Sequence, residues 1–174
     1  MSRFVRLAFV GIATILPFSP AAAAPVSADM DVPASARILS PLVLEKLSNL
    51  DFGRIIIGDV VGTQTVSIDP ISGSISGCSN GVTCLGPVQR ASFFVHGTPD
   101  VRVRIDSNSS NLTNELGDTL VFTPAHPSST MLLAWPGGPA SGRGFFAVGG
   151  SITLSATTAV GLYQGTIEVT VDYM

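Results

Sequence analysis

Apolar and polar residues alternate along much of this 174-residue chain. The clearest short examples lie at 65–69, 101–106 and 151–155, where every second residue is Val, Ile or Leu. A period of two residues is typical of a β-strand with one buried face. Helical periodicity is not sustained, and its longest candidate is Leu42–Leu50, directly after Pro41. About nine short strands, separated by Gly, Pro, Asn and Asp turns, predict an all-β, antiparallel two-sheet sandwich.

The longest alternating segment is Tyr163–Tyr173, near the end of the chain. Its odd positions are apolar or glycine, with a tyrosine at each end, and its even positions are all polar. Eleven alternating residues form a long strand by ordinary standards. The pattern predicts a terminal strand of the sandwich with one apolar face.

The N-terminus has the features of a secretory signal peptide. Arg3 and Arg6 precede an apolar stretch at Leu7–Leu16, and small residues follow at Ala21–Ala24. This arrangement predicts a signal peptide over 1–24, cut somewhere between 23 and 28. The apolar stretch is short for a membrane anchor, which is the alternative interpretation. We therefore expect a flexible mature N-terminus over 25–33 and a sandwich domain over 34–174.

The signal peptide predicts export to the periplasm, the cell surface or the extracellular space, with no membrane insertion after its removal. Charged residues make up 12% of the chain, hydrophobic residues make up 45%, and the formal net charge is −3. A chain so poor in basic residues is not expected to bind nucleic acid. Its high apolar content also argues against intrinsic disorder.

Export bears on the two cysteines, Cys78 and Cys84, because disulfides persist in oxidising compartments. Asn80-Gly81 lies between them and is a strong tight-turn signal. We expect a local disulfide across a hairpin, worth about 2 kcal/mol by the chain-entropy estimate. A metal site is the alternative, but two thiols without neighbouring His or Cys supply too few ligands.

No arrangement of residues indicates catalysis. His96 and His126 lack the spacing of a metal site, and the chain has no Gly-x-Ser-x-Gly elbow. The aspartates fall mostly in turns or on polar faces, where turn chemistry accounts for them. We expect no catalytic, cofactor-binding or metal-binding residues and no cofactor.

Four segments occur in order behind the predicted signal peptide. They are Asn49-Leu50-Asp51-Phe52-Gly53, Val95-His96-Gly97-Thr98-Pro99, Val148–Leu154 and Gly161–Tyr173. Together they resemble a family of secreted bacterial domains, domain of unknown function 4402, which is similar to spore coat protein U and to chaperone–usher pilins. The resemblance runs from Ala34 to Tyr173. It implies a pilin-like, immunoglobulin-like fold that lacks its final strand.

In such pilins a neighbouring subunit or a periplasmic chaperone supplies the missing strand by β-strand addition. The resemblance places the assembly strand near the C-terminus, on Tyr163, Ile167, Val169, Val171 and Tyr173. A candidate donor strand lies near the mature N-terminus, where Met30, Val32, Ala34, Ala36 and Ile38 occupy every second position. The other interpretation of 34–44 is the domain's own first strand, because Pro33 interrupts the donor and its alanines fill a groove weakly.

The resulting hypothesis is a non-enzymatic secreted structural subunit of a surface filament, fimbria or coat. Its expected partners are further copies of itself or a periplasmic chaperone and usher. One alternative is a stand-alone exported sandwich that binds a ligand or surface without polymerising. A secreted hydrolase is the other, although no nucleophile and base can be named for it.

Overall fold

The computed structural model describes residues 33–134 and 142–174, which form twelve β-strands and no helix. Residues Arg37–Met174 form one compact unit. The strands are β1 (Val43–Ser48), β2 (Arg54–Ile57), β3 (Thr63–Ile68), β4 (Ile75–Ser76), β5 (Val82–Leu85), β6 (Ala91–His96), β7 (Arg102–Ser107), β8 (Ser110–Thr113), β9 (Thr119–Ala125), β10 (Thr130–Leu132), β11 (Arg143–Ser155) and β12 (Val169–Tyr173). The predicted signal peptide and its cleavage window lie outside the described residues.

Every strand pair is antiparallel, and the strands form three sheets. The largest has seven strands in the order β1-β6-β11-β3-β4, with β9 also paired to β11 and β8 to β9. A second sheet has the order β10-β7-β12, and β2 pairs with β5 in a third. More strands form than the pattern predicted, because strands of two to four residues such as β4, β8 and β10 are too short to show alternation.

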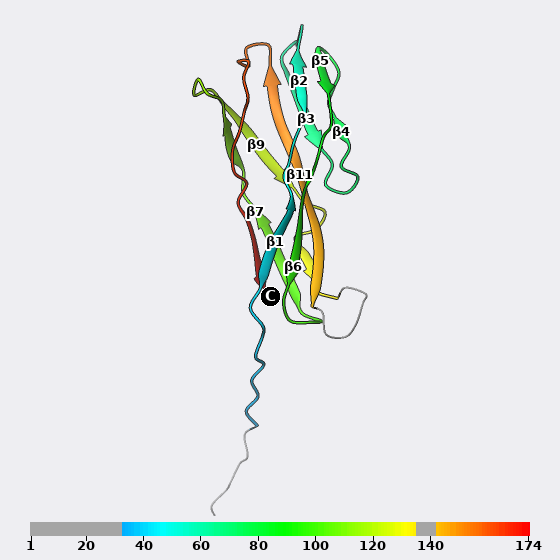
Figure 1. The fold of residues 1–174 in the computed structure, drawn as a ribbon, viewed down its shortest axis with the longest axis vertical. Helices are drawn as coiled ribbons and strands as arrows, with labels where there is room; N and C mark the ends of the chain where they lie inside the picture. The colour runs from blue at the N-terminus through cyan, green and yellow to red at the C-terminus, as the bar shows by residue number, and fades with distance from the viewer. Residues whose placement is uncertain (1–32, 135–141) are drawn as a thin grey trace, which may run out of the picture. The chain divides into compact units, whose positions relative to one another are not determined.

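The long strand β11 organises the fold. Figure 1 shows it in orange, running along β6 and then past β9 and β3. Residues 143–148 pair with β6, whereas the later residues pair with β9 and β3. The change of partner falls at Gly149-Gly150. Gly150 has a φ of +146°, and a Cβ at Gly149 would lie 2.1 Å from the Ile68 carbonyl oxygen, so both positions require glycine.

Two hydrophobic clusters fill the space between the sheets. The first joins β6 and the first half of β11 to the β10-β7-β12 sheet, through residues that include Phe93, Val103 and Phe146. The second surrounds Phe122 and Ile152 and includes side chains from β2 and β5. The alternating segments at 65–69, 101–106 and 151–155 bury their predicted apolar positions, which are at most 8% exposed. The predicted antiparallel sandwich is therefore confirmed.

The disulfide between Cys78 and Cys84 is present, but the predicted hairpin around it is not. Asn80 and Gly81 do form a tight turn with φ values of 52° and 87°. The flanking strands then diverge, because β4 pairs with β3 while β5 pairs with β2. The disulfide thus joins Cys78, just after β4 of one sheet, to Cys84 on β5 of another, and both cysteines pack against the second hydrophobic cluster.

The predicted eleven-residue C-terminal strand is also corrected. Only Val169–Tyr173 forms β12, which pairs with β7. Upstream, Gln164 makes an isolated bridge to Thr113 at the end of β8, with N···O distances of 2.8 and 3.0 Å. The segment therefore passes from one sheet to another between 164 and 169, which interrupts the backbone ladder even though the side-chain alternation continues.

Candidate functional site

The strand β12 lies at an open edge of its sheet. It pairs antiparallel with β7, in a register that places Asp172 opposite Arg104. The backbone hydrogen bonds just beyond each end, from Met174 N to Arg102 O and from Asn108 N to Glu168 O, fall on even-numbered residues of this segment. Along an antiparallel ladder, residues that hydrogen-bond to the partner strand alternate with residues whose backbone groups point away from it. The N–H and C=O groups of Val169, Val171 and Tyr173 therefore point away from β7.

The same three residues carry the apolar side chains of β12. Val169, Val171 and Tyr173 pack against the first hydrophobic cluster, and all three stay only half-buried. Thr170 and Asp172 are exposed on the other face. Among the described strands only β7 pairs with β12. This edge therefore combines unpaired backbone groups with incompletely covered core side chains, the features of a site for strand addition.

The edge strand of the facing sheet is β1, which pairs only with β6 within the described residues. Leu42 and Leu50, just before and after β1, pack against the first cluster and are half-buried. Val43, Leu44 and Leu47 are 56%, 38% and 47% exposed. No backbone ladder joins β1 to β12 in the part of the chain that the structure describes, so the sandwich is unclosed between these strands.

A cluster of hydrogen bonds joins the end of β12 to the residues that precede β1. The Tyr173 hydroxyl donates to the Ser40 carbonyl and accepts from the Thr98 backbone N–H, both at 2.7 Å. The Thr98 hydroxyl in turn accepts from the Ser40 N–H at 2.7 Å. The gap between β1 and β12 is closed at this end, and a strand added there would have to stop at Tyr173.

The opposite edge of the same sheet is capped by its own chain. Thr130 on β10 points its N–H and C=O away from β7, and the Ser128 hydroxyl bonds to both, at 3.2 and 2.8 Å. The outward carbonyl of Leu132 accepts from Ala134 N at 3.0 Å. Self-capping of this kind protects a sheet edge from further pairing. Of the two edges, β12 has the one that remains open.

The other residues predicted for assembly lie elsewhere. Tyr163 and Ile167 precede β12 and are half-buried. The Tyr163 hydroxyl donates to the Ala159 carbonyl, and Ile167 packs on the second cluster. Of the candidate donor residues, Met30 and Val32 lie outside the described residues. Ala34, Ala36 and Ile38 are exposed and belong to no strand, whereas part of 34–44 enters β1 at Val43.

Several residues of this site were not predicted from the sequence. Ser40 and Thr98 bind Tyr173, Leu42 and Leu50 form the facing apolar wall, and Ser128 caps β10. Thr98 and Leu50 do occur in the family segments quoted above, which is the signal that could have indicated them. Ser40 acts through its own backbone N–H and C=O, and the Ser128 hydroxyl bonds to the backbone of Thr130, so no side-chain pattern marks these contacts.

His96, His126 and Asp69 make local contacts in separate parts of the described structure. His96 Nε2 lies 3.7 Å from Glu45 Oε2 on the neighbouring strand, and the His126 ring bonds to the Ser128 carbonyl. Backbone and hydroxyl hydrogen bonds from Ser72, with the Ile71 N–H, lower the pKa of Asp69 in the β3–β4 loop. Across 33–134 and 142–174 no three His, Cys, Asp or Glu side chains gather to hold a metal ion. The same residues contain no helix long and apolar enough to cross a membrane.

Comparison with known proteins identifies the family. The family described as Domain of unknown function (DUF4402) matches residues 42–173. These bounds begin just before β1 and end with β12, so the match spans the whole sandwich. No curated protein and no solved structure matches the chain. The resemblance to the DUF4402 family is thus confirmed over residues 42–173, and the chain belongs to that family.

Proposed function

We propose that this protein is an exported, non-enzymatic structural subunit that assembles into a surface filament, fimbria or coat by β-strand addition. The sandwich is then a pilin-like, immunoglobulin-like domain, and the open edge of β12 is where a strand from another copy or from a periplasmic chaperone pairs. One observation carries the proposal. Within the described part of the chain, Val169, Val171 and Tyr173 present unpaired backbone groups and half-buried core side chains at the same edge.

An added strand would satisfy both features together. Its backbone would pair with the three outward N–H and C=O groups, and its alternate side chains would cover the first hydrophobic cluster between β1 and β12. Assembly of this kind is head-to-tail and open-ended, because the donor and acceptor surfaces differ. That geometry generates a fibre.

A proline substitution tests the edge directly. Val171→Pro removes an outward N–H at the centre of β12, whereas the bonds of Thr170 and Asp172 to β7 remain. Proline is tolerated on edge strands for this reason. Val171→Ala is the matched control, because it shortens the side chain and keeps the N–H.

We expect wild-type protein, isolated without heating, to give a ladder of bands in detergent gels that boiling removes. Val171→Pro should give monomers, and Val171→Ala should keep the ladder. Thermal unfolding of each variant shows whether the domain is intact. A single monomer band for the wild type under every condition, or an undiminished ladder for folded Val171→Pro, would overturn the proposal.

The second candidate is a stand-alone exported binding module. Two observations favour it: Val43–Ser48 already pairs within its own sheet as β1, and the hydrogen bonds around Tyr173 close one end of the gap. This candidate predicts a stable wild-type monomer in the gel experiment. The same experiment therefore separates the two functions.

A further inference from the structure

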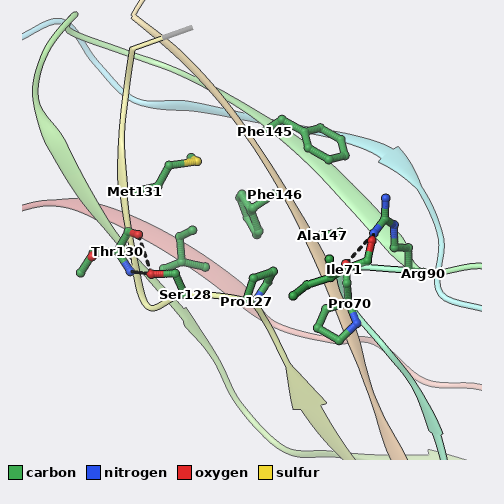
Figure 2. Close-up of a pocket in the computed structure, with 11 residues that line it drawn as sticks. Pro70, Ile71, Arg90, Pro127, Ser128, Thr130, Met131, Phe145, Phe146 and Ala147 are labelled. Atoms are coloured by element: carbon green, nitrogen blue, oxygen red, sulfur yellow. Dashed lines mark hydrogen bonds between the residues drawn. The ribbon is translucent and has the colours of Figure 1, made fainter. Parts of the chain in front are cut away.

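A cleft of about 440 Å³ lies at the capped edge of the β10-β7-β12 sheet, across the sheet from the open edge of β12. Figure 2 shows Met131 and Phe146 on its walls, with Ile71 and Arg90 on the far side. The cleft reaches into the first hydrophobic cluster, because Ile105, which is 2% exposed, also lines it. Cavities of about 300–1,000 Å³ with mostly apolar walls are typical of small-molecule sites.

The backbone around the cleft disfavours an added strand. Ser128 occupies the outward N–H and C=O of Thr130, and Ala134 occupies the outward carbonyl of Leu132. A peptide laid along β10 would find few backbone partners. An occupant of this cleft is therefore held through contacts with side chains, which suits a small molecule.

Among the described residues that line the cleft, Arg90 alone is charged. One terminal nitrogen of its guanidinium donates to the carbonyls of Pro70 and Ile71, which fixes the side chain beside the apolar wall. Figure 2 shows the second terminal nitrogen on the side away from these carbonyls. No hydrogen bond to that nitrogen is found within the described part of the chain.

Besides the hydrogen bonds from Ser72, the positive charge of Arg90 helps to lower the pKa of the Asp69 carboxyl, but Asp69 takes no hydrogen bond from the guanidinium. Asp69 Oδ1 accepts from the backbone N–H groups of Ile71 and Ser72 and from the Ser72 hydroxyl, at 2.7–3.0 Å. The ion pairs within 4 Å among the described residues are Glu45–His96 and Arg104–Asp106. Asp69 and Arg90 do not form one. A guanidinium with free donors binds carboxylates well.

We propose that this cleft binds one small amphipathic carboxylate, a free medium-chain fatty acid or a molecule of that class. The carboxylate contacts the free donors of Arg90, and the hydrocarbon chain lies against Met131 and Phe146. This site is separate from the open edge of β12 and does not depend on the proposed assembly. Its binding is measured on monomer and on assembled protein alike.

The test is a calorimetric titration of the full mature protein with decanoate, below the concentration at which it forms micelles. Decanol is titrated in parallel as the uncharged analogue. The two variants are Arg90→Gln and Ile71→Asp. Ile71 lines the cleft and is 70% exposed, so its replacement should leave the fold intact. Arg102→Gln is the control, since Arg102 is exposed on β7 and does not line the cleft.

We expect saturable binding of one decanoate per chain. Arg90→Gln should weaken decanoate binding about tenfold or more while changing decanol binding little, as expected for the loss of a charged hydrogen bond. Ile71→Asp should weaken both, and Arg102→Gln neither. The proposal fails if decanoate does not saturate, or if Arg90→Gln and Ile71→Asp bind it as the wild type does. It also fails if the protein sediments with phosphatidylglycerol vesicles and Arg90→Gln abolishes this sedimentation but leaves decanoate binding unchanged. The anion that Arg90 binds would then be a lipid headgroup.

Discussion

The phenolic oxygen of Tyr173 lies 2.7 Å from the carbonyl oxygen of Ser40, across 133 residues of sequence. The same hydroxyl accepts from the Thr98 N–H, so one side chain connects the last strand, the β6–β7 turn and the residues before β1. Gly97 makes this approach feasible, because a Cβ there would lie 2.5 Å from the Tyr173 oxygen. The end of β12 is fixed by this arrangement while its edge stays open.

Tyr173→Phe should lower the free energy of unfolding by about 2 kcal/mol, because the two short hydrogen bonds to Ser40 and the Thr98 N–H are lost at about 1 kcal/mol each, together with the longer contact to the Thr98 hydroxyl. Tyr163→Phe is the matched control. Its hydroxyl makes one hydrogen bond, to the Ala159 carbonyl, and its loss should cost about half as much. Urea denaturation measures both values. Equal losses in the two variants would contradict a special role for the Tyr173 hydroxyl.

Reduction of the Cys78–Cys84 disulfide should lower the free energy of unfolding by about 2 kcal/mol, the chain-entropy estimate for so short a loop. Because the bond links the β4 side of one sheet to β5 of another, its loss should loosen β2 and β5 first. Hydrogen exchange with and without reductant measures that local effect. The double variant Cys78→Ser with Cys84→Ser is the control, since its exchange should not respond to reductant.

Side-chain alternation predicted which faces of the strands are buried but not which strands pair. Val66, Val103 and Ile152 were assigned correctly to the core, because a period of two reports the face on which each residue lies. The same signal continues through Tyr163–Tyr173 although the backbone ladder breaks at 164–169. Pairing depends on backbone hydrogen bonds, which the identity of the side chains specifies only indirectly.

The Ser40 and Ser128 contacts at the candidate site could not be predicted from the sequence for a similar reason. Ser40 contributes a carbonyl, and Ser128 uses a hydroxyl on the backbone of Thr130 two residues away. Neither contact leaves a periodic or compositional trace in the sequence. Tyr173 could be singled out because the family segments end on it, but its partners are set by the tertiary fold.

Acidification should destabilise the domain through Asp69. Hydrogen bonds from Ser72, then from the Ile71 N–H, hold the folded pKa of Asp69 below its ordinary value of 3.8. A lowered folded pKa contributes stability that is present above pH 3.8 and is lost as the pH falls through the folded pKa. Asp69→Asn should therefore show a smaller drop in melting temperature between pH 5 and pH 2. Identical pH profiles for the two proteins would show that this carboxylate contributes nothing.

Removal of the β10 cap should create a second open edge. Ser128→Ala frees the outward N–H and C=O of Thr130 and should lower the free energy of unfolding by about 1 kcal/mol. Unprotected edges promote pairing between molecules, so this variant should self-associate more strongly in sedimentation velocity. Ser129→Ala is the neighbouring control, because Ser129 is exposed and pairs through its backbone carbonyl. Matching association of the two variants would mean that Ser128 does not protect the edge.

Gly150, where β11 changes partners, should not tolerate a larger side chain. In Gly150→Ala the new Cβ would lie 2.5 Å from Phe122 Cζ and 2.5 Å from the Thr123 carbonyl oxygen, at a φ of +146°. Backbone strain and overpacking of the second cluster then act together, and the free energy of unfolding should fall by about 3 kcal/mol or more.

Gly117→Ala separates the two causes, since Gly117 also has a positive φ but nothing lies within 4 Å of its Cβ. Its loss should be about 1 kcal/mol, from backbone strain alone. Equal denaturation midpoints for the two variants would show that contact with Phe122 does not determine how β11 passes between the sheets.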